Sequence, residues 1–292
     1  MIQKLLDYCG ANSVANLVFL EMTIQVLIPA RNPTEVILGT VESLVSQTDM
    51  QFSVLISDNY STTGQPYVND ACNVLRKNGI LVELVRPPRP LGRVEHWNWI
   101  AHESAGDIIK PLFVGDSLAP IYMEALKASL DRFKGADIVT SGLVPCTSEL
   151  PKQVRGTRDS LHDPQTILCL AAAQGNTLGG PSNVAIRRSA FIECGGFSPA
   201  LPVSADFCLF LQIALRGGVV QLGDALIHFN RHPDRFSSAF PIERIFGDRE
   251  LVIALLLATS SAQFTGLTIP FNARNRFFLR LFKRSFRHML RF

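Results

Sequence analysis

The 292-residue sequence lacks any continuous apolar run of about 18 residues, the length that a membrane-spanning helix needs. Its longest candidate run, Leu251 to Ala258, is far shorter. We therefore expect no spanning helix. The first 21 residues make a poor signal peptide, because Asp7 interrupts a weakly apolar stretch. We interpret residues 1–21 as an N-terminal extension outside the folded domain.

Several binding signatures are also missing. The loop after the first predicted strand contains neither G-x-G-x-x-G nor G-x-x-x-x-G-K-[ST], which argues against dinucleotide binding and against a P-loop. The six cysteines are dispersed and form no C-x-x-C pair, which argues against a zinc knuckle or a redox dithiol. Such dispersed cysteines are typical of small apolar side chains in a reducing compartment.

The most informative stretch that is present covers residues 24–62. An apolar run at 24–28 predicts a strand that ends at Pro29, and helical spacing follows over 36–45. A second apolar run at 52–56 leads into Ser57 and Asp58. Strand, helix and strand form a βαβ unit, and ligands of such sheets bind at the carboxyl ends of the strands. Asp58 is thus placed to accept hydrogen bonds from a base or a ribose.

The remaining pattern predicts one large α/β domain. Further helices are predicted at 66–77, 93–103, 121–133, 188–194 and 207–215, and further strands at 81–85, 107–114, 138–140, 183–186 and within 219–227. The polar, proline-containing segment 145–165 is predicted to be a loop.

At this point the residues resemble a known family. Ile28-Pro29-Ala30-Arg31-Asn32, followed by Ser57-Asp58-Asn59-Tyr60-Ser61-Thr62, is similar to the opening of glycosyltransferase family 2. The resemblance covers residues 22–240 and implies a GT-A fold, a mostly parallel sheet flanked by helices. It implies a donor half up to about residue 140 and an acceptor half after it. Where the family often has a second acid in this loop, Thr63 and Gly64 stand here.

The implied reaction transfers a sugar from a UDP- or dTDP-linked donor to a hydroxyl of a glycan or lipid-linked acceptor, with inversion. The resemblance and the loop positions together assign a set of donor-binding residues. They are Pro29, Arg31, Asn32, Asp58, Asn59, Arg93, Asn98 and Asn183. For Arg93, capping of a helix is the alternative.

Asp116 follows an apolar strand and precedes Pro120. A carboxylate at the end of a strand suits a hard cation, Mg or Mn, that bridges a diphosphate. In the family this is the metal-binding Asp of an acidic pair, whose first member is Gly115 here. The resemblance adds His232 as a metal or phosphate contact, with His228 as a competitor. The alternative for Asp116 is a cap of the following helix.

Asp206 begins a predicted helix after Gly195-Gly196-Phe197. An inverting transfer needs a base at the acceptor hydroxyl, and the resemblance places that base at Asp206. The family's preceding Glu is Ala205 here, and its usual later Arg is Gln212. The alternative is an Asp that only caps the helix.

The C-terminal region 241–292 is predicted to be helical and ends in a basic amphipathic tail. From Arg274 to Phe292 there are seven Lys/Arg and no Asp or Glu, with apolar residues spaced by three and four. We expect this tail to bind an anionic membrane surface, which makes the protein cytoplasmic and peripherally membrane-associated. A terminal helix packed on the core is the alternative. The rest of the chain is net acidic and has no recognised nucleic-acid motif, so no nucleic-acid partner is expected.

Two other classes of protein remain open. A nucleotidyltransferase also uses an α/β sheet and a metal-binding Asp, but it is expected to carry a glycine-rich phosphate loop and a basic residue near the first strand, where only Arg31 is available. The other is a non-catalytic family member that binds a partner or a membrane. The departures at Gly115, Ala205 and Gln212 keep this second alternative open.

Overall fold

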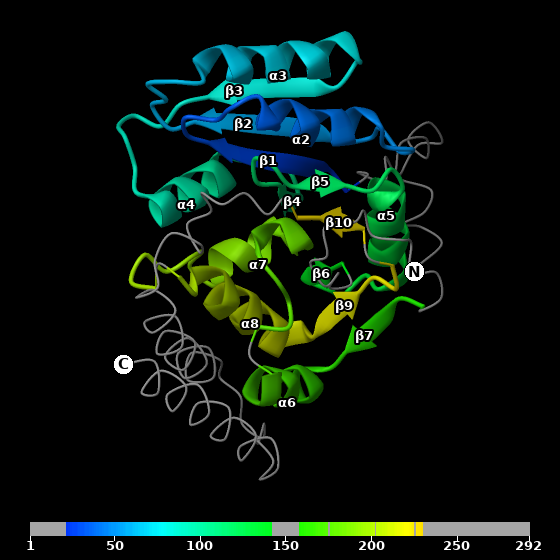
Figure 1. The fold of residues 1–292 in the computed structure, drawn as a ribbon. Coiled ribbons are helices and arrows are strands. Elements are labelled where there is room, and N and C mark those ends of the chain that lie inside the picture. The colour runs from blue at the N-terminus through cyan, green and yellow to red at the C-terminus, as the bar shows by residue number, and fades with distance from the viewer. Residues whose placement is uncertain (1–21, 142–157, 175, 202, 225, 230–292) are drawn as a thin grey trace, which may run out of the picture.

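The computed structural model describes residues 22–141, 158–174, 176–201, 203–224 and 226–229. Within these residues a central sheet has the strand order β3-β2-β1-β4-β8-β6-β9-β7 (Figure 1). The strands are β1 Ile24–Ala30, β2 Ser53–Asp58, β3 Leu81–Val85, β4 Ile108–Pro111, β6 Ile138–Thr140, β7 Ser160–His162, β8 Val184–Arg187 and β9 Val219–Gln221. The β3-β2-β1-β4 half is wholly parallel, and antiparallel β8 joins it to the second half.

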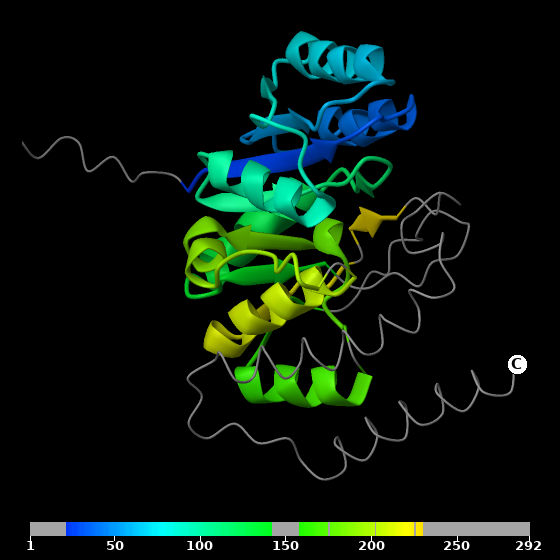
Figure 2. The same cartoon turned by 90° about the vertical axis from the view of Figure 1, so that its left-hand side faces the viewer.

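Helices cover both faces of this sheet. They are α2 Val36–Val45, α3 Gln65–Lys77, α4 Arg93–Glu103, α5 Tyr122–Arg132, α6 Pro164–Gln174, α7 Arg188–Glu193 and α8 Ala205–Gly217, with the short 3₁₀ helix η1 at Pro181–Asn183. Two further strands, β5 Ser117–Leu118 and β10 Ile227–His228, pair as a separate antiparallel ribbon. Figures 1 and 2 both show α6 beside α8, far from α2 and α3.

The period-two pattern of β1 explains the layers. Val26 and Ile28 pack into one buried cluster with α2, α3 and α5, whereas Leu27 packs into a second cluster with α4, α6, α7 and α8. Successive side chains of a strand point to opposite faces of its sheet, so a continuous apolar run is buried on both faces. This arrangement confirms the predicted α/β class, a mostly parallel sheet flanked by helices.

Two local predictions were wrong. Residues 145–165 were predicted to be a loop, but β7 lies at Ser160–His162 and α6 begins at Pro164. The signal for α6 was present: Asp163 accepts the Thr166 N–H at 2.8 Å, and a proline occupies the first turn, which is a standard helix start. The strand predicted over 107–114 ends at Pro111.

Several predictions lie outside the described residues. They are the extension 1–21, His232 and the C-terminal region 241–292, so the proposed domain boundaries stay predictions. None of the described helices is both long enough and apolar enough to cross a membrane.

Candidate functional site

The loops that follow β1, β2, β3 and β4 gather at one edge of the sheet. These strands are parallel neighbours, so their carboxyl ends face the same way. Arg31 follows β1, Asp58 ends β2, Arg86 follows β3 and Asp116 follows β4. This edge is where open α/β sheets bind ligands.

Asn32 ties the first two of these loops together. Its side-chain oxygen accepts hydrogen bonds from the N–H groups of Thr62 and Thr63, at 2.8 and 3.1 Å. The residue has φ of 47°, a left-handed conformation that asparagine tolerates. Gly64 has φ of 78°, and a Cβ there would lie 1.9 Å from the Pro33 carbonyl oxygen. That close approach explains why glycine, and no acid, stands at the end of this loop.

Asp58 is buried and holds an ion pair with Arg86. One carboxylate oxygen lies 2.5 Å from the Arg86 guanidinium, and the other accepts the Ser61 N–H at 3.1 Å. Arg86 also lies over the ring of Tyr60, 5.3 Å from its centre. The sequence analysis missed Arg86. The available signal was its place directly after the third parallel strand.

A buried histidine lies beneath this pair. His96 Nε2 is 2.7 Å from the Ser57 hydroxyl oxygen. Burial lowers the pKa of His96 to about 4, although the Asp58 charge opposes this effect, and the Arg31 charge adds to it. The imidazole is therefore neutral at pH 7.

Three of the predicted donor-binding residues use their amides inside the protein. Asn59 exchanges two hydrogen bonds with the backbone of Leu91, both at 2.9 Å. Asn98 does the same with the backbone of Phe197, both at 2.8 Å. The amide nitrogen of the fully buried Asn183 lies within 3.0 Å of three oxygens, on Thr140, Ser141 and Leu178. Any contact of these residues with a donor stays a prediction.

Asp116 lies in a tight turn after β4. Gly115 has φ of 94° and donates its N–H to the Thr40 hydroxyl at 2.8 Å. This backbone conformation favours glycine, which accounts for the missing first acid. The buried Asp116 accepts a hydrogen bond from the Ser182 hydroxyl at 2.6 Å. Helix α5 has Ile121 at its start, with no side-chain cap, so Asp116 does not cap it.

The β5–β10 ribbon places a histidine next to the chain segment that carries Asp116. His228 pairs with Ser117, the residue that follows Asp116. The residues that the structure describes contain no group of three His, Cys, Asp or Glu that could hold a metal. A cation that bridges a diphosphate needs fewer protein ligands, because phosphates and water complete its shell. The Asp116 carboxylate, at the end of the parallel half of the sheet, fits such an ion.

Lys110, in the middle of β4, is completely buried. Its Nζ donates to the carbonyl oxygens of Pro111 and Ser182, at 2.8 and 2.5 Å, and lies 5.0 Å from the centre of the Tyr122 ring. Burial lowers the pKa of Lys110 to about 7, although the Asp116 charge opposes this. The sequence analysis missed this residue, and its signal was a lysine within an apolar strand.

Asp206 lies in the first turn of α8, after the N-cap residue Ser204. Its carboxylate accepts the Phe207 N–H at 2.7 Å. Burial raises the pKa of Asp206 to about 6, against the effects of that N–H and of the Arg93 charge. A carboxylate of this pKa is ionised at pH 7 and is a stronger base than an ordinary one.

Aromatic contacts connect Asp206 with the Asp116 turn. The Arg93 guanidinium lies over Trp97, 5.0 Å from its centre, and the Trp97 ring centre lies 4.8 Å from that of Phe113. Arg93 does not cap α4, because Gly92 is the N-cap residue of that helix and the Glu95 side chain accepts the Gly92 N–H. The structure thus places Arg93 between the predicted base and the strand-end loops.

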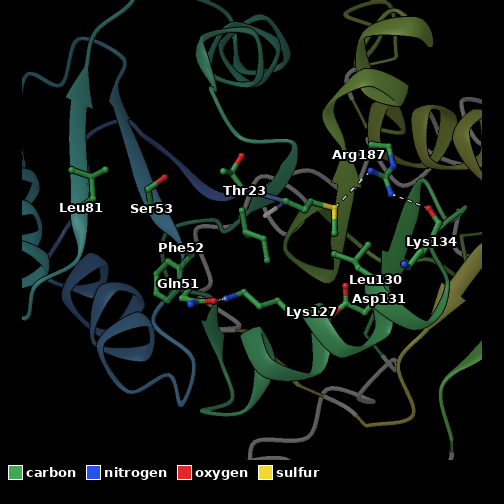
Figure 3. A pocket seen from close by; sticks show the side chains of 12 residues that line it. Thr23, Gln51, Phe52, Ser53, Leu81, Lys127, Leu130, Asp131, Lys134 and Arg187 are labelled. Carbon is green, nitrogen blue, oxygen red and sulfur yellow. Dashed lines mark hydrogen bonds between the residues drawn. The ribbon is translucent and has the colours of Figure 1, made fainter. Parts of the chain in front are cut away.

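A cavity of about 870 Å³ lies elsewhere. Figure 3 shows Thr23, Ser53 and Leu81 on its wall, at the amino ends of the parallel strands, with Lys127 and Arg187 facing them. It therefore opens at the edge of the sheet opposite the polar loops. We do not assign the candidate site to this cavity.

Comparison with known proteins supports these assignments at the level of the fold. No known family model matches the sequence. An uncharacterized glycosyltransferase of Haemophilus influenzae is 23% identical over 190 residues, which is 65% of this chain. The chain spans 61% of the length of that relative.

Solved structures share the architecture. TarS 1-349 of S. aureus in complex with UDP has a TM-score of 0.61 at 14% identity, covering 84% of this chain and 67% of that one. The UDP-GlcNAc complex of TarS has a TM-score of 0.60 at 15% identity, covering 88% and 78%. The mannosyltransferase PcManGT from Pyrobaculum calidifontis, in complex with GDP-Man and Mn²⁺, has a TM-score of 0.53 at 17% identity, covering 85% and 65%. The predicted resemblance to GT-A glycosyltransferases is confirmed.

Proposed function

We propose that this chain, which has the fold of the GT-A glycosyltransferases, transfers a sugar from a nucleotide-diphosphate sugar to a hydroxyl group with inversion. The observation that carries the proposal is the placement of three carboxylates relative to the strand-end loops. Asp58 and Asp116 lie at one edge of the sheet, and Asp206 is linked to that edge through Arg93, Trp97 and Phe113.

The donor nucleotide is bound at the ends of β1, β2 and β3. Asp58 accepts hydrogen bonds from the base or the ribose, while the Arg86 guanidinium holds the Asp58 carboxylate in position. Arg31 and Arg93 supply positive charge for the diphosphate. The complexes of TarS with UDP and UDP-GlcNAc support a nucleotide-sugar donor, for which we favour UDP or dTDP.

Asp116 holds a divalent cation, Mg or Mn, together with His228 or His232. When bound, this ion supplies positive charge that neutralises the diphosphate leaving group. The Mn²⁺ in the mannosyltransferase complex supports the choice of ion. The protein's own contribution is to orient the Asp116 carboxylate through its hydrogen bond with Ser182.

Asp206 acts as the general base. It takes the proton from the acceptor hydroxyl as the oxygen attacks the anomeric carbon on the face opposite the diphosphate, which gives inversion. Its raised pKa of about 6 makes it a better proton acceptor than an ordinary carboxylate while it stays ionised at pH 7. The Arg93 charge stabilises the ionised form.

The acceptor and location are proposed from the tail, whose residues lie outside the described part of the chain. The basic amphipathic pattern of Arg274–Phe292 favours an anionic membrane surface. A glycan or lipid-linked acceptor at the cytoplasmic face, as in polysaccharide biosynthesis, fits that location.

A donor-turnover assay tests the proposal. Purified protein is incubated with a panel of nucleotide sugars, with Mg²⁺, Mn²⁺ or chelator, and free nucleoside diphosphate is measured. We expect metal-stimulated release of nucleoside diphosphate from one class of donor. Release of pyrophosphate from a nucleoside triphosphate and a sugar phosphate would instead establish a nucleotidyltransferase. Protein that binds nucleotide sugar but never releases diphosphate, with any acceptor, would be a non-catalytic family member.

A further inference from the structure

Lys110 is an unusual residue for the strand that carries it. Its neighbours Ile108 and Ile109 are apolar, and all three side chains are buried. Burying an ammonium group costs several kcal/mol unless hydrogen bonds and opposite charge compensate for the lost water. A methionine of similar length would fill the same space without that cost. The ammonium therefore has a purpose other than filling the core.

The hydrogen bonds of Lys110 identify its partner. Besides the adjacent Pro111 carbonyl, Nζ contacts the carbonyl oxygen of Ser182, which is 72 positions away in the chain. Ser182 belongs to η1, which lies in the predicted acceptor half. Lys110 thus fastens η1 to the end of β4, in the donor half.

Ser182 also forms a hydrogen bond with Asp116. Its hydroxyl accepts the Phe113 N–H at 3.0 Å and donates to Asp116 Oδ2 at 2.6 Å. Because the N–H occupies a lone pair of the hydroxyl oxygen, the hydroxyl hydrogen is directed to the carboxylate. The Lys110 and Asp116 charges also attract one another across Ser182. Ser182 therefore orients the Asp116 carboxylate, and Lys110 in turn fixes the position of Ser182.

We propose that Lys110 and Ser182 are positioning residues that set the orientation of the Asp116 carboxylate toward the donor diphosphate and its cation. The inference rests on the proposed function, since it assigns Asp116 to the cation. Residues that orient a metal ligand typically affect metal affinity by about ten- to a hundredfold.

A purely structural role of Lys110 and Ser182 predicts a different result. If Lys110 and Ser182 only attached η1 to β4, their loss would lower the melting temperature and leave the dependence of nucleotide binding on the cation unchanged. If they orient Asp116, the cation-dependent part of the binding falls, while nucleotide binding without cation, which uses Asp58 and Arg86, is retained.

The test compares Ser182→Ala and Lys110→Met with the wild-type full-length chain. UDP binding is measured by calorimetry over a series of Mn²⁺ concentrations and in chelator, and melting temperatures are recorded in parallel. Ser129→Ala is the matched control, because Ser129 is also fully buried but its hydroxyl has no hydrogen-bond partner among the described residues. We expect about ten- to a hundredfold weaker Mn²⁺-dependent binding in both variants, and wild-type binding in the control.

The outcomes separate this inference from the proposed function. Wild-type protein that binds neither UDP nor dTDP, with or without Mn²⁺, would overturn the proposed function and this inference together. Wild-type protein that binds UDP with Mn²⁺, while Ser182→Ala binds it with the same Mn²⁺ dependence, would overturn this inference alone. If Lys110→Met fails to fold, Ser182→Ala decides the question, since it removes a single oxygen atom.

Discussion

The Arg86 guanidinium lies 2.5 Å from the buried carboxylate of Asp58, and this ion pair joins the ends of β2 and β3. The two partners differ in exposure: the Arg86 side chain is 49% exposed, and that of Asp58 is 2% exposed. The pair therefore presents a cation to solvent above an anion that is anchored in the sheet. This geometry suits a ligand that offers both hydroxyl groups and phosphates.

Replacing Arg86 is expected to weaken nucleotide binding more than it weakens the fold. Arg86→Met removes the exposed cation and leaves Asp58 without its charged partner, and the lost charged hydrogen bond corresponds to about tenfold in affinity. Calorimetric titration with UDP measures the effect. Arg89→Met is the control, because Arg89 is exposed nearby and, within the part of the chain that the structure describes, donates only to the carbonyl of the adjacent Pro90. Equal affinities for the two variants would show that Arg86 does not contact the donor.

Asp116→Asn is expected to weaken metal-dependent binding of UDP or dTDP greatly while the fold stays intact. The amide keeps the shape of the carboxylate but loses the negative charge that a hard cation requires. Calorimetry with and without Mn²⁺ measures the change. Asp131→Asn, at an exposed position of α5, serves as the control. Unchanged metal-dependent affinity in Asp116→Asn would refute the metal assignment.

Asp206→Asn is expected to lower turnover by about 10²-fold or more, with donor affinity close to wild type, because the acceptor hydroxyl loses its base. The wild-type rate should rise as the pH increases through about 6 and then level off, since Asp206 must be ionised to accept the proton. Initial rates from pH 5 to pH 8 check both statements. A variant that transfers sugar at the wild-type rate would leave Asp206 without a catalytic role.

The same substitution should stabilise the fold at neutral pH. The pKa of Asp206 is raised in the folded state, so the native protein binds this proton more tightly than the unfolded chain does. Its contribution to stability is complete at low pH and is lost as the pH rises through about 6. Above that pH the wild-type protein buries a charged carboxylate, and Asp206→Asn does not. The difference in the free energy of unfolding is at most about 3 kcal/mol. Melting temperatures at pH 4 and pH 8 test this. The melting temperature of the variant should exceed that of the wild type only at the higher pH.

Removal of residues 274–292 is expected to release the protein from anionic liposomes and to leave UDP binding unchanged. The segment has seven Lys/Arg and no acid, and each cation near the surface contributes about 1 kcal/mol, screened by salt. Co-sedimentation of full-length and truncated protein at low and high salt measures the effect. Equal sedimentation of both forms would sink the membrane proposal, and a lower melting temperature on truncation would indicate a helix packed on the core.

Much of the frame around the site could be predicted from local patterns. The apolar runs of β1 and β2, with helical spacing between them, predicted the βαβ unit and the loop that holds Asp58. The apolar run over 107–114 likewise predicted that Asp116 follows a strand, although β4 itself ends at Pro111. These predictions succeed because the periodicity of a strand or a helix depends on residues that are close together in the sequence. β7 was missed, since three residues at the end of a sheet carry little periodic signal.

The sequence by itself determined the alternation of strands and helices, and with it the edge of the sheet where the polar loops meet. Only the tertiary structure decided what each polar side chain does there. Asp58 forms an ion pair with Arg86, and Lys110 donates to Ser182, which in turn donates to Asp116. The side-chain amides of Asn59 and Asn98 form hydrogen bonds with the protein backbone. Hydrogen bonds act over about 3 Å, and their partners here come from segments far apart in the chain, so they exist only once these segments have packed together.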